Sequence, residues 1–245
     1  MSLNFHSVWQ QVQPSPLLWL TVTLVVYVSS IKLYQKLKYN PLALPVLTSV
    51  CIIVALLVFS DTSYETYFSG VKLLHFLIGP ATVALAIPLY HQLPKLISLW
   101  RPLSISLVIG ALTGLVSSGI ITASFGGSAD MIISLLPRST TMPIAMAISE
   151  HFGGTPSLTA VSVALTGIVG SIVALPVFHL LRIEDPVAKG VAMGVSAHAI
   201  GTARIIQFDE AMGAFSALAM SVTGILTAIF MPFVVEAMYA SGLLS

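Results

Sequence analysis

Three stretches of the sequence, residues 103–125, 157–181 and 211–235, contain no Asp, Glu, Lys or Arg. Each is longer than the roughly 20 apolar residues with which an α-helix crosses the hydrocarbon core of a bilayer. Only 8% of the chain is charged and 56% is hydrophobic, whereas soluble proteins carry about 25% charged residues. The chain is therefore predicted to be an integral membrane protein. A soluble enzyme and a disordered linker are excluded.

The few charged residues nearly balance, with a formal net charge of +1. No basic surface is available to neutralise phosphates, so no nucleic-acid partner is expected. The single cysteine, Cys51, cannot form an internal disulfide. The first 16 residues lack the basic region and cleavage site of a signal peptide, so the first apolar run is expected to be retained.

Further apolar runs at residues 17–34, 42–59 and 71–90 add three candidate helices to the three uncharged ones. Two more segments, 131–150 and 187–207, are apolar but interrupted. With short loops, 245 residues allow seven or eight hydrophobic segments. We expect an all-α polytopic membrane protein in which residues 1–245 form a single transmembrane domain.

The interruptions consist of prolines, small residues and polar side chains. Pro137 and Pro143 bracket a cation and three hydroxyls in the first segment, and residues 194–204 combine glycines, hydroxyls, an imidazole and a guanidinium in the second. Lipid offers no hydrogen bonds, so irregular backbone at membrane depth must be buried in protein or line a wet cavity. We expect both segments to be broken or re-entrant.

The distribution of Lys and Arg gives an orientation, because these residues gather on the cytoplasmic side. Placing residues 32–38 inside puts the N-terminus outside. If residues 131–150 enter and leave on one face, Arg182 and Lys189 also fall inside; if they cross as a full helix, both fall outside. The first arrangement is favoured, in a multi-pass protein of the inner (plasma) membrane.

The two interrupted segments belong to a faint internal repeat. Shifting the sequence by 57 residues aligns 131–178 with 188–235, and each unit has an interrupted polar segment followed by an uncharged span. One crossing per unit would invert the copies and bring their polar tips together near the bilayer midplane. Inverted repeats with broken helices are typical of secondary transporters.

The polar groups of these segments suit a small anion. Guanidinium groups and free N–H groups at helix starts bind carboxylates and phosphates, and a cation inside a membrane segment normally has a task. Asp130 and Glu150 are expected at the outer surface, so they are poorly placed to form a binding site for a cation. The candidate substrate-binding residues are Arg138, Ser139, Thr140, Thr141, Pro143, Ser196, His198, Gly201, Thr202 and Arg204.

Structural roles remain open for the same residues. Arg138 and Arg204 could reach headgroups or pair with Glu150 and Asp209, and His198 could bond a backbone carbonyl. The hydroxyls at 139–141 could cap backbone groups freed by the prolines. Gly110-x-x-x-Gly114 and Gly190-x-x-x-Gly194 fit close helix packing.

Other function classes have weaker support in the sequence. Ser196 lacks the final glycine of a nucleophile elbow, and a Ser139/His198 dyad would have no carboxylate to orient the imidazole. No motif for a metal or nucleotide cofactor occurs. No span has the continuous polar face of a pore. We therefore expect neither an enzyme nor a channel, and no cofactor or metal.

Four motifs resemble the LrgB/CidB family over nearly the whole chain. They are Asn40-Pro41-Leu42, Pro80–Ala86 with Pro88-Leu89-Tyr90, Leu136–Met146 and Ser196–Arg204. The chain departs from the family pattern at Arg138, where lysine is usual, and at Met142, where a second proline-adjacent Thr is usual. The resemblance adds Asn40 to the candidate substrate-binding residues.

The resemblance implies two functions. One is an antiholin-like regulator of murein hydrolase export and cell lysis, acting with a separate LrgA/CidA-type membrane partner. The other is transport of small monocarboxylates, since plant plastid relatives carry glycolate and glycerate and bacterial relatives are linked to pyruvate uptake.

We expect a carrier for glycolate, glycerate or pyruvate, with the lysis regulator as the alternative. In that carrier Arg138 or Arg204 would pair with the carboxylate, and His198 would accept a coupling proton. The expected partners are the carboxylate, membrane lipid, an LrgA/CidA-like protein and further copies of the chain.

Overall fold

The computed structural model describes residue 9 and residues 12–84 and 86–244, and every regular element in them is a helix. Residues 1–8, 10, 11, 85 and 245 lie outside the described part, and most of the segment that was tested for a signal peptide lies among them. The chain divides into two compact units, residues 1–84 and 85–245. The expectation of one transmembrane domain over residues 1–245 stays a prediction.

The first unit is built on a pair of apolar helices. Trp19, on the first of them, is 2% exposed and packs edge-to-face on Tyr67, while a Cβ on Gly70 would lie 2.8 Å from the Trp19 Cβ. In the connection between these two helices, Asn40 caps the short helix that follows it: the Asn40 Oδ1 accepts a hydrogen bond from Leu42 N at 3.0 Å. The helices are α2 (Pro16–Lys36), η1 (Pro41–Ala43), α3 (Pro45–Phe59), α4 (Tyr64–Gly70) and α5 (Lys72–Ala84).

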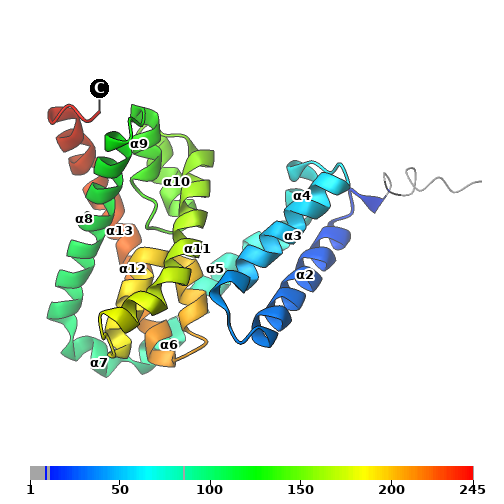
Figure 1. The fold of residues 1–245 in the computed structure, drawn as a ribbon, viewed down its shortest axis with the longest axis horizontal. Coiled ribbons are helices and arrows are strands. Elements are labelled where there is room, and N and C mark those ends of the chain that lie inside the picture. The colour runs from blue at the N-terminus through cyan, green and yellow to red at the C-terminus, as the bar shows by residue number, and fades with distance from the viewer. Residues whose placement is uncertain (1–8, 10–11, 85, 245) are drawn as a thin grey trace, which may run out of the picture. The chain divides into compact units, whose positions relative to one another are not determined.

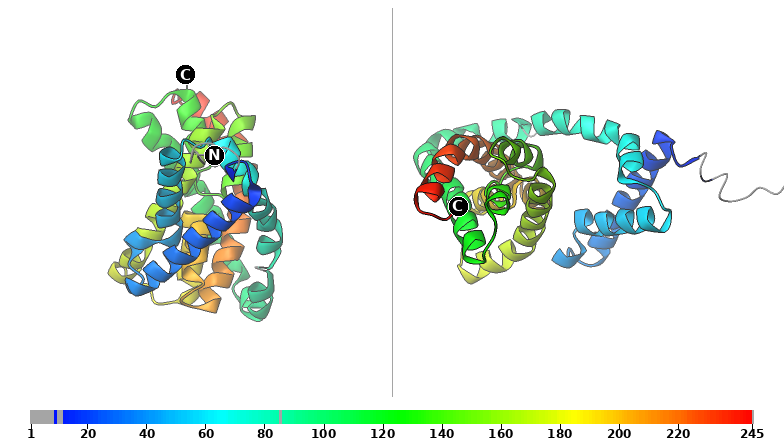
Figure 2. Two further views of the ribbon diagram at one scale, coloured as in Figure 1. Left: turned by 90° about the vertical axis from the view of Figure 1, so that its right-hand side faces the viewer. Right: turned by 90° about the horizontal axis from the view of Figure 1, so that it is seen from above.

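The second unit contains both interrupted segments and three of the long helices. Its helices lie side by side in one bundle (Figures 1 and 2). They are α6 (Ala86–His91), α7 (Leu93–Ser98), α8 (Trp100–Ser124), α9 (Ala129–Leu135), α10 (Met142–His151), α11 (Pro156–Leu180), α12 (Pro186–Ile205) and α13 (Glu210–Ala240).

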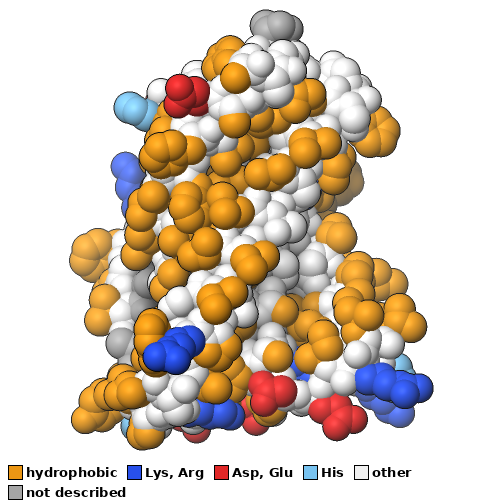
Figure 3. Space-filling model, turned by 90° about the vertical axis from the view of Figure 1, so that its left-hand side faces the viewer, with side chains coloured by type: hydrophobic (Ala, Val, Ile, Leu, Met, Phe, Trp, Pro, Cys, Tyr) orange, Lys and Arg blue, Asp and Glu red, His pale blue; other side chains and the backbone are white. Residues whose placement is uncertain are grey.

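Four of the described helices, α2, α8, α11 and α13, are long and apolar enough to cross a membrane. Their outer side chains are apolar: Val161 and Val173 on α11 are 56% and 46% exposed. Figure 3 shows hydrophobic side chains over much of one face. Soluble proteins rarely expose patches of this size, so these surfaces fit lipid rather than water.

The expected count of seven or eight segments is not confirmed by the described residues. The 42–59 run yields α3, which has only 15 residues, because Pro41 and Pro45 start separate helices there. In the 71–90 run the structure describes α5 up to Ala84 and α6 from Ala86, and residue 85 between them lies outside the described part. Proline interrupts the hydrogen-bond ladder of a helix, so an apolar run alone overestimates helix length.

The 131–150 segment forms a helical hairpin. Residues 136–141 separate α9 from α10, and the chain returns after α10 to where α9 lies: the Ser134 hydroxyl accepts a hydrogen bond from Thr155 N at 2.7 Å. The connecting loop reaches about halfway along the bundle (Figure 1). The predicted interruption is present at this position.

The 187–207 segment is broken as well. His198 has φ 41° and ψ −134°, which divides α12 into two helical pieces. The first piece packs against α13: a Cβ on Gly190 would lie 2.5 Å from the Met212 carbonyl oxygen, and one on Gly194 would overlap that of Ser216. These contacts confirm close packing for Gly190-x-x-x-Gly194.

The turn between α10 and α11 depends on a glycine. Gly153 has φ +88°, and no heavy atom lies within 4 Å of the position that a Cβ would occupy. A left-handed conformation costs an L-residue roughly 1–2 kcal/mol. Gly153→Ala is therefore expected to destabilise the protein by about 1 kcal/mol in denaturant unfolding in detergent.

Gly79→Ala is the control for that measurement, because Gly79 is helical, its φ is not positive and its Cβ would also meet no atom within 4 Å. Equal unfolding free energies for Gly153→Ala and the wild type would contradict a conformational role for Gly153.

Candidate functional site

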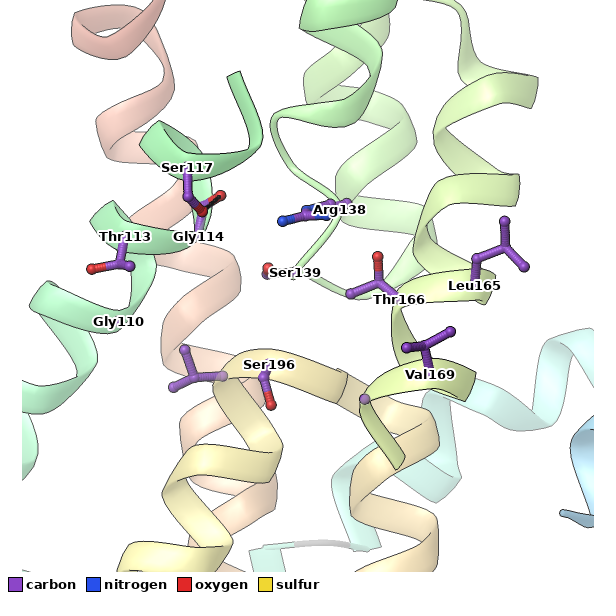
Figure 4. A pocket seen from close by; sticks show the side chains of 12 residues that line it. Gly110, Thr113, Gly114, Ser117, Arg138, Ser139, Leu165, Thr166, Val169 and Ser196 are labelled. Carbon is purple, nitrogen blue, oxygen red and sulfur yellow. Dashed lines mark hydrogen bonds between the residues drawn. The ribbon is translucent and has the colours of Figure 1, made fainter. Parts of the chain in front are cut away.

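A polar pocket of about 630 Å³ lies where the tips of the two broken segments approach each other. It sits at half the length of α8 and α11, so these two 25-residue helices would place it near a bilayer midplane. Figure 4 shows the lining, which consists of Gly110, Thr113, Gly114 and Ser117 on α8, Arg138 and Ser139 in the hairpin loop, Leu165, Thr166, Val169 and Gly170 on α11, and Val195 and Ser196 on α12.

Among the residues that the structure describes, Arg138 supplies the only positive charge in the pocket lining. Its side chain extends from the hairpin loop into the space between α8 and α11 (Figure 4). The Nε atom is buried without a hydrogen-bond partner, and within the described residues the guanidinium forms no ion pair. A buried cationic donor without a partner is costly. The structural alternative in which Arg138 pairs with an acidic neighbour is therefore absent from the described residues, and the group is free for an anionic ligand.

Three hydroxyls around this guanidinium have free hydrogen-bonding capacity. Within the described part of the chain, no side-chain hydrogen bond occurs for Thr113, Ser139 or Thr166. Ser196 also lines the pocket, but its hydroxyl donates to the Ala192 carbonyl at 2.6 Å and is turned along its own helix (Figure 4). The pocket thus offers one cation and several neutral hydrogen-bonding groups.

A glycine on α8 allows the hairpin tip to come this close. A Cβ on Gly114 would lie 3.1 Å from the Ser139 hydroxyl oxygen, tighter than an ordinary contact. Only a residue without a side chain at position 114 keeps Ser139 on the pocket wall without displacement. Gly110-x-x-x-Gly114 therefore serves close packing at the site itself.

The structure places four of the predicted substrate residues away from the pocket. The His198 Nε2 lies 3.0 Å from the Val163 carbonyl oxygen, the structural role that the sequence left open. Thr202 bonds the His198 carbonyl at 2.8 Å and the Ser216 hydroxyl at 2.7 Å. All four are buried and none lines the pocket: Gly201, His198, Thr202 and Arg204.

Arg204 has a structural role that differs from both of the structural alternatives left open by the sequence. It is 4% exposed, so it does not reach a headgroup, and its guanidinium donates to the Ser171 carbonyl rather than pairing with Asp209. The second helical piece of α12 is thereby attached to α11. The predicted contact of Arg204 with the same ligand as Arg138 finds no support in this geometry.

The remaining candidates surround the hairpin loop or lie in the other unit. Thr140 is buried and its hydroxyl donates to the Pro137 carbonyl at 3.1 Å, within the hairpin loop itself. Thr141 precedes α10 without a side-chain cap, and Pro143 occupies the first turn. Asn40 belongs to the first unit and caps η1.

Thr113, Ser117 and Thr166 were not singled out from the sequence, because they lie in uncharged spans that were assigned to the scaffold. The Gly-x-x-x-Gly motif on α8 was the one available signal, since it marks the helix face that another segment approaches. Among the described residues, no cluster of His, Cys, Asp and Glu could hold a metal ion.

Long apolar helices around a polar pocket at half their length define a polytopic helical membrane protein with a ligand-sized pocket. The sequence model of the LrgB-like family matches residues 23–237. The chain belongs to that family. No solved structure matches it.

Three relatives show how far the similarity extends. The uncharacterized protein YxaC of Bacillus subtilis is 36% identical over 214 residues, covering 87% of this chain and 93% of the relative. An uncharacterized protein of Haemophilus influenzae is 34% identical, with 85% and 88% covered. The antiholin-like protein LrgB of Bacillus mycoides is 30% identical, with 90% and 97% covered.

Proposed function

We propose that this protein is a membrane carrier for small monocarboxylates of the glycolate, glycerate or pyruvate type. The observation that carries the proposal is the unpaired Arg138 guanidinium in a polar pocket at half the length of the long helices. A guanidinium presents two parallel N–H donors that match the two oxygens of a carboxylate. At membrane depth this pairing is worth more than at a water-facing surface.

The pocket chemistry favours one carboxylate over two. Arg138 is the single cation of the described lining, so a second carboxylate would be buried without a counter-charge. Ser139, Thr113 and Thr166 suit the remaining oxygens of a small hydroxy or keto acid. The first turn of α10 begins at Met142, three residues beyond Ser139, and adds the positive end of a helix dipole near the loop.

The orientation proposed from the sequence fits the charges of the second unit. Lys95, Arg101, Arg182 and Lys189 lie at the end where α8 and α12 begin and α11 ends. Asp130 and Glu150 lie at the other end, near the start of α11. We assign the basic end to the cytoplasm of the plasma membrane, with the N-terminus outside.

The two broken segments would re-enter the membrane from opposite faces in this orientation. The α9–α10 hairpin would enter from outside and α12 from inside, each followed by a long helix, α11 or α13, that crosses. Inverted repeats with these bounds, 131–178 and 188–235, would let the tips change exposure between the faces. Transport rather than catalysis is proposed, because His198 is engaged by Val163 rather than by a serine.

Regulation of murein hydrolase export and cell lysis, together with an LrgA/CidA-type partner, is the second candidate function. The observation in its favour is that relatives 30% identical over most of both chains carry the name antiholin-like protein LrgB.

The deciding experiment measures uptake of labelled glycolate and pyruvate into liposomes that contain only the purified protein, with and without a pH gradient. We expect saturable uptake that unlabelled monocarboxylates compete and dicarboxylates do not. Assembly into homo-oligomers is followed in the same preparation by light scattering.

If uptake is absent, the assay is repeated with an LrgA-type protein in the same liposomes. Uptake in that case would support a two-component carrier. A second absence would contradict the transport function and leave the lysis regulator.

A further inference from the structure

A second cavity, of about 510 Å³, adjoins the polar pocket. It follows α8 and the first piece of α12 to the basic end of the bundle, where Leu99 and Asp185 form its lining. Its walls are mostly apolar, with Leu103, Val187 and Val191 among them. Together the two cavities extend from one end of the second unit to the half-way point of its helices.

Gly110 and Val195 line both cavities. They are in close contact: a Cβ on Gly110 would lie 2.8 Å from Val195 Cγ1 and 3.7 Å from Val195 Cβ. A β-branched side chain in a helix has one strongly preferred rotamer, so Val195 cannot easily turn aside. The two cavities therefore share walls that touch at this contact, and the contact exists because residue 110 has no side chain.

We propose that the Gly110–Val195 contact is the constriction through which the carboxylate passes between the pocket and the basic end. This inference rests on the proposed transport function. The residues of the constriction determine which molecules pass. An apolar constriction of this kind excludes water and ions when its walls touch and admits them when the walls separate. Val195 precedes the break at His198 by three residues, so movement of the α12 tip would separate the walls.

The second cavity has the properties of a passage rather than of a second binding site. Ser106 and Asp185 are the polar side chains of its lining. The Asp185 carboxylate caps α12, its Oδ1 accepting from Ala188 N at 2.8 Å. No cation lies on the described walls of this cavity, so an anion would not be bound there in competition with the guanidinium of Arg138.

The test measures the rate at which an anionic thiosulfonate reagent modifies a cysteine placed beyond the constriction. The parent protein is full length with Cys51→Ser and Thr113→Cys, reconstituted in vesicles, and the reagent is added to the basic side. Adding Gly110→Ala is expected to slow modification about tenfold, because the new methyl group closes the gap. Val195→Ala is expected to accelerate it by about the same factor.

The double variant makes the test specific. With both Gly110→Ala and Val195→Ala present, the closest remaining approach is that of two Cβ atoms about 3.7 Å apart, an ordinary contact. Modification is therefore expected to return to the parent rate. Ser98→Cys in the Cys51→Ser protein, exposed at the basic end, is the matched control, and its modification rate should not respond to either change.

A parent rate unchanged by Gly110→Ala would overturn the proposal, since the reagent would then reach Thr113→Cys by another route. If Gly110→Ala does not fold, Val195→Ala decides alone, and absence of acceleration overturns the proposal. Modification does not require transport. A wild type that fails the uptake assays while the variants follow this pattern would contradict the carrier function but not the constriction.

Discussion

Replacing Arg138 by Ala is expected to weaken glycolate or pyruvate binding roughly 100-fold, because a charge-assisted pair contributes about 1.5–3 kcal/mol per bond and 1.4 kcal/mol is a factor of ten. Binding is measured by titration calorimetry on the purified protein in detergent. Saturable uptake in liposomes should fall with it. Arg138→Lys should retain part of the affinity, because the charge remains while the two parallel donors are lost.

Arg101→Ala is the matched control for this experiment. Arg101 is an exposed arginine at the basic end, where it lies over the Trp100 ring. Its removal deletes the same charge without touching the pocket, so affinity should stay within about twofold of the wild type. An Arg138→Ala protein that is correctly folded and binds with wild-type affinity would contradict the site assignment.

The largest loss of stability is expected from Gly194→Ala. The added Cβ would overlap the Ser216 carbonyl oxygen and lie 2.9 Å from Met220 N, both backbone atoms of α13. Overpacking a close-packed contact costs about 1–3 kcal/mol of unfolding free energy. A loss near the top of this range is expected here, because backbone atoms must move. The variant should show a lower melting temperature in detergent and an aggregated fraction in size-exclusion chromatography.

The displacement would also reach the pocket, since Val195 and Ser196 follow directly on α12. Gly79→Ala, with no atom within 4 Å of its Cβ, controls for the loss of a glycine in an apolar helix. A melting temperature for Gly194→Ala equal to that of this control would mean that α12 and α13 are separated more widely than the structure places them.

Periodicity and charge predicted the long helices well, because length and hydropathy are local properties. The spans at 103–125, 157–181 and 211–235 correspond to α8, α11 and α13. The number of spans was predicted less well. The 42–59 run looked continuous in composition, but its helix α3 begins only at Pro45 and has 15 residues.

The candidate site was predicted in part. Arg138 and Ser139 were expected to meet Ser196 at the tips of the broken segments, and all three line one pocket. His198 and Arg204 were expected beside them, but each bonds a backbone carbonyl of α11 instead. A polar residue in an apolar sequence signals a need for a partner without saying whether that partner is a ligand or the protein itself.

Contiguous residues were sufficient to predict that this chain belongs in a membrane, that two segments are broken and that each of them carries a cation, because these properties follow from local composition. Tertiary structure decided which polar groups are satisfied internally and which remain free. That choice depends on contacts between residues far apart in the chain, such as His198 with Val163 and Gly114 with Ser139. No local pattern specifies the distances across which those residues meet.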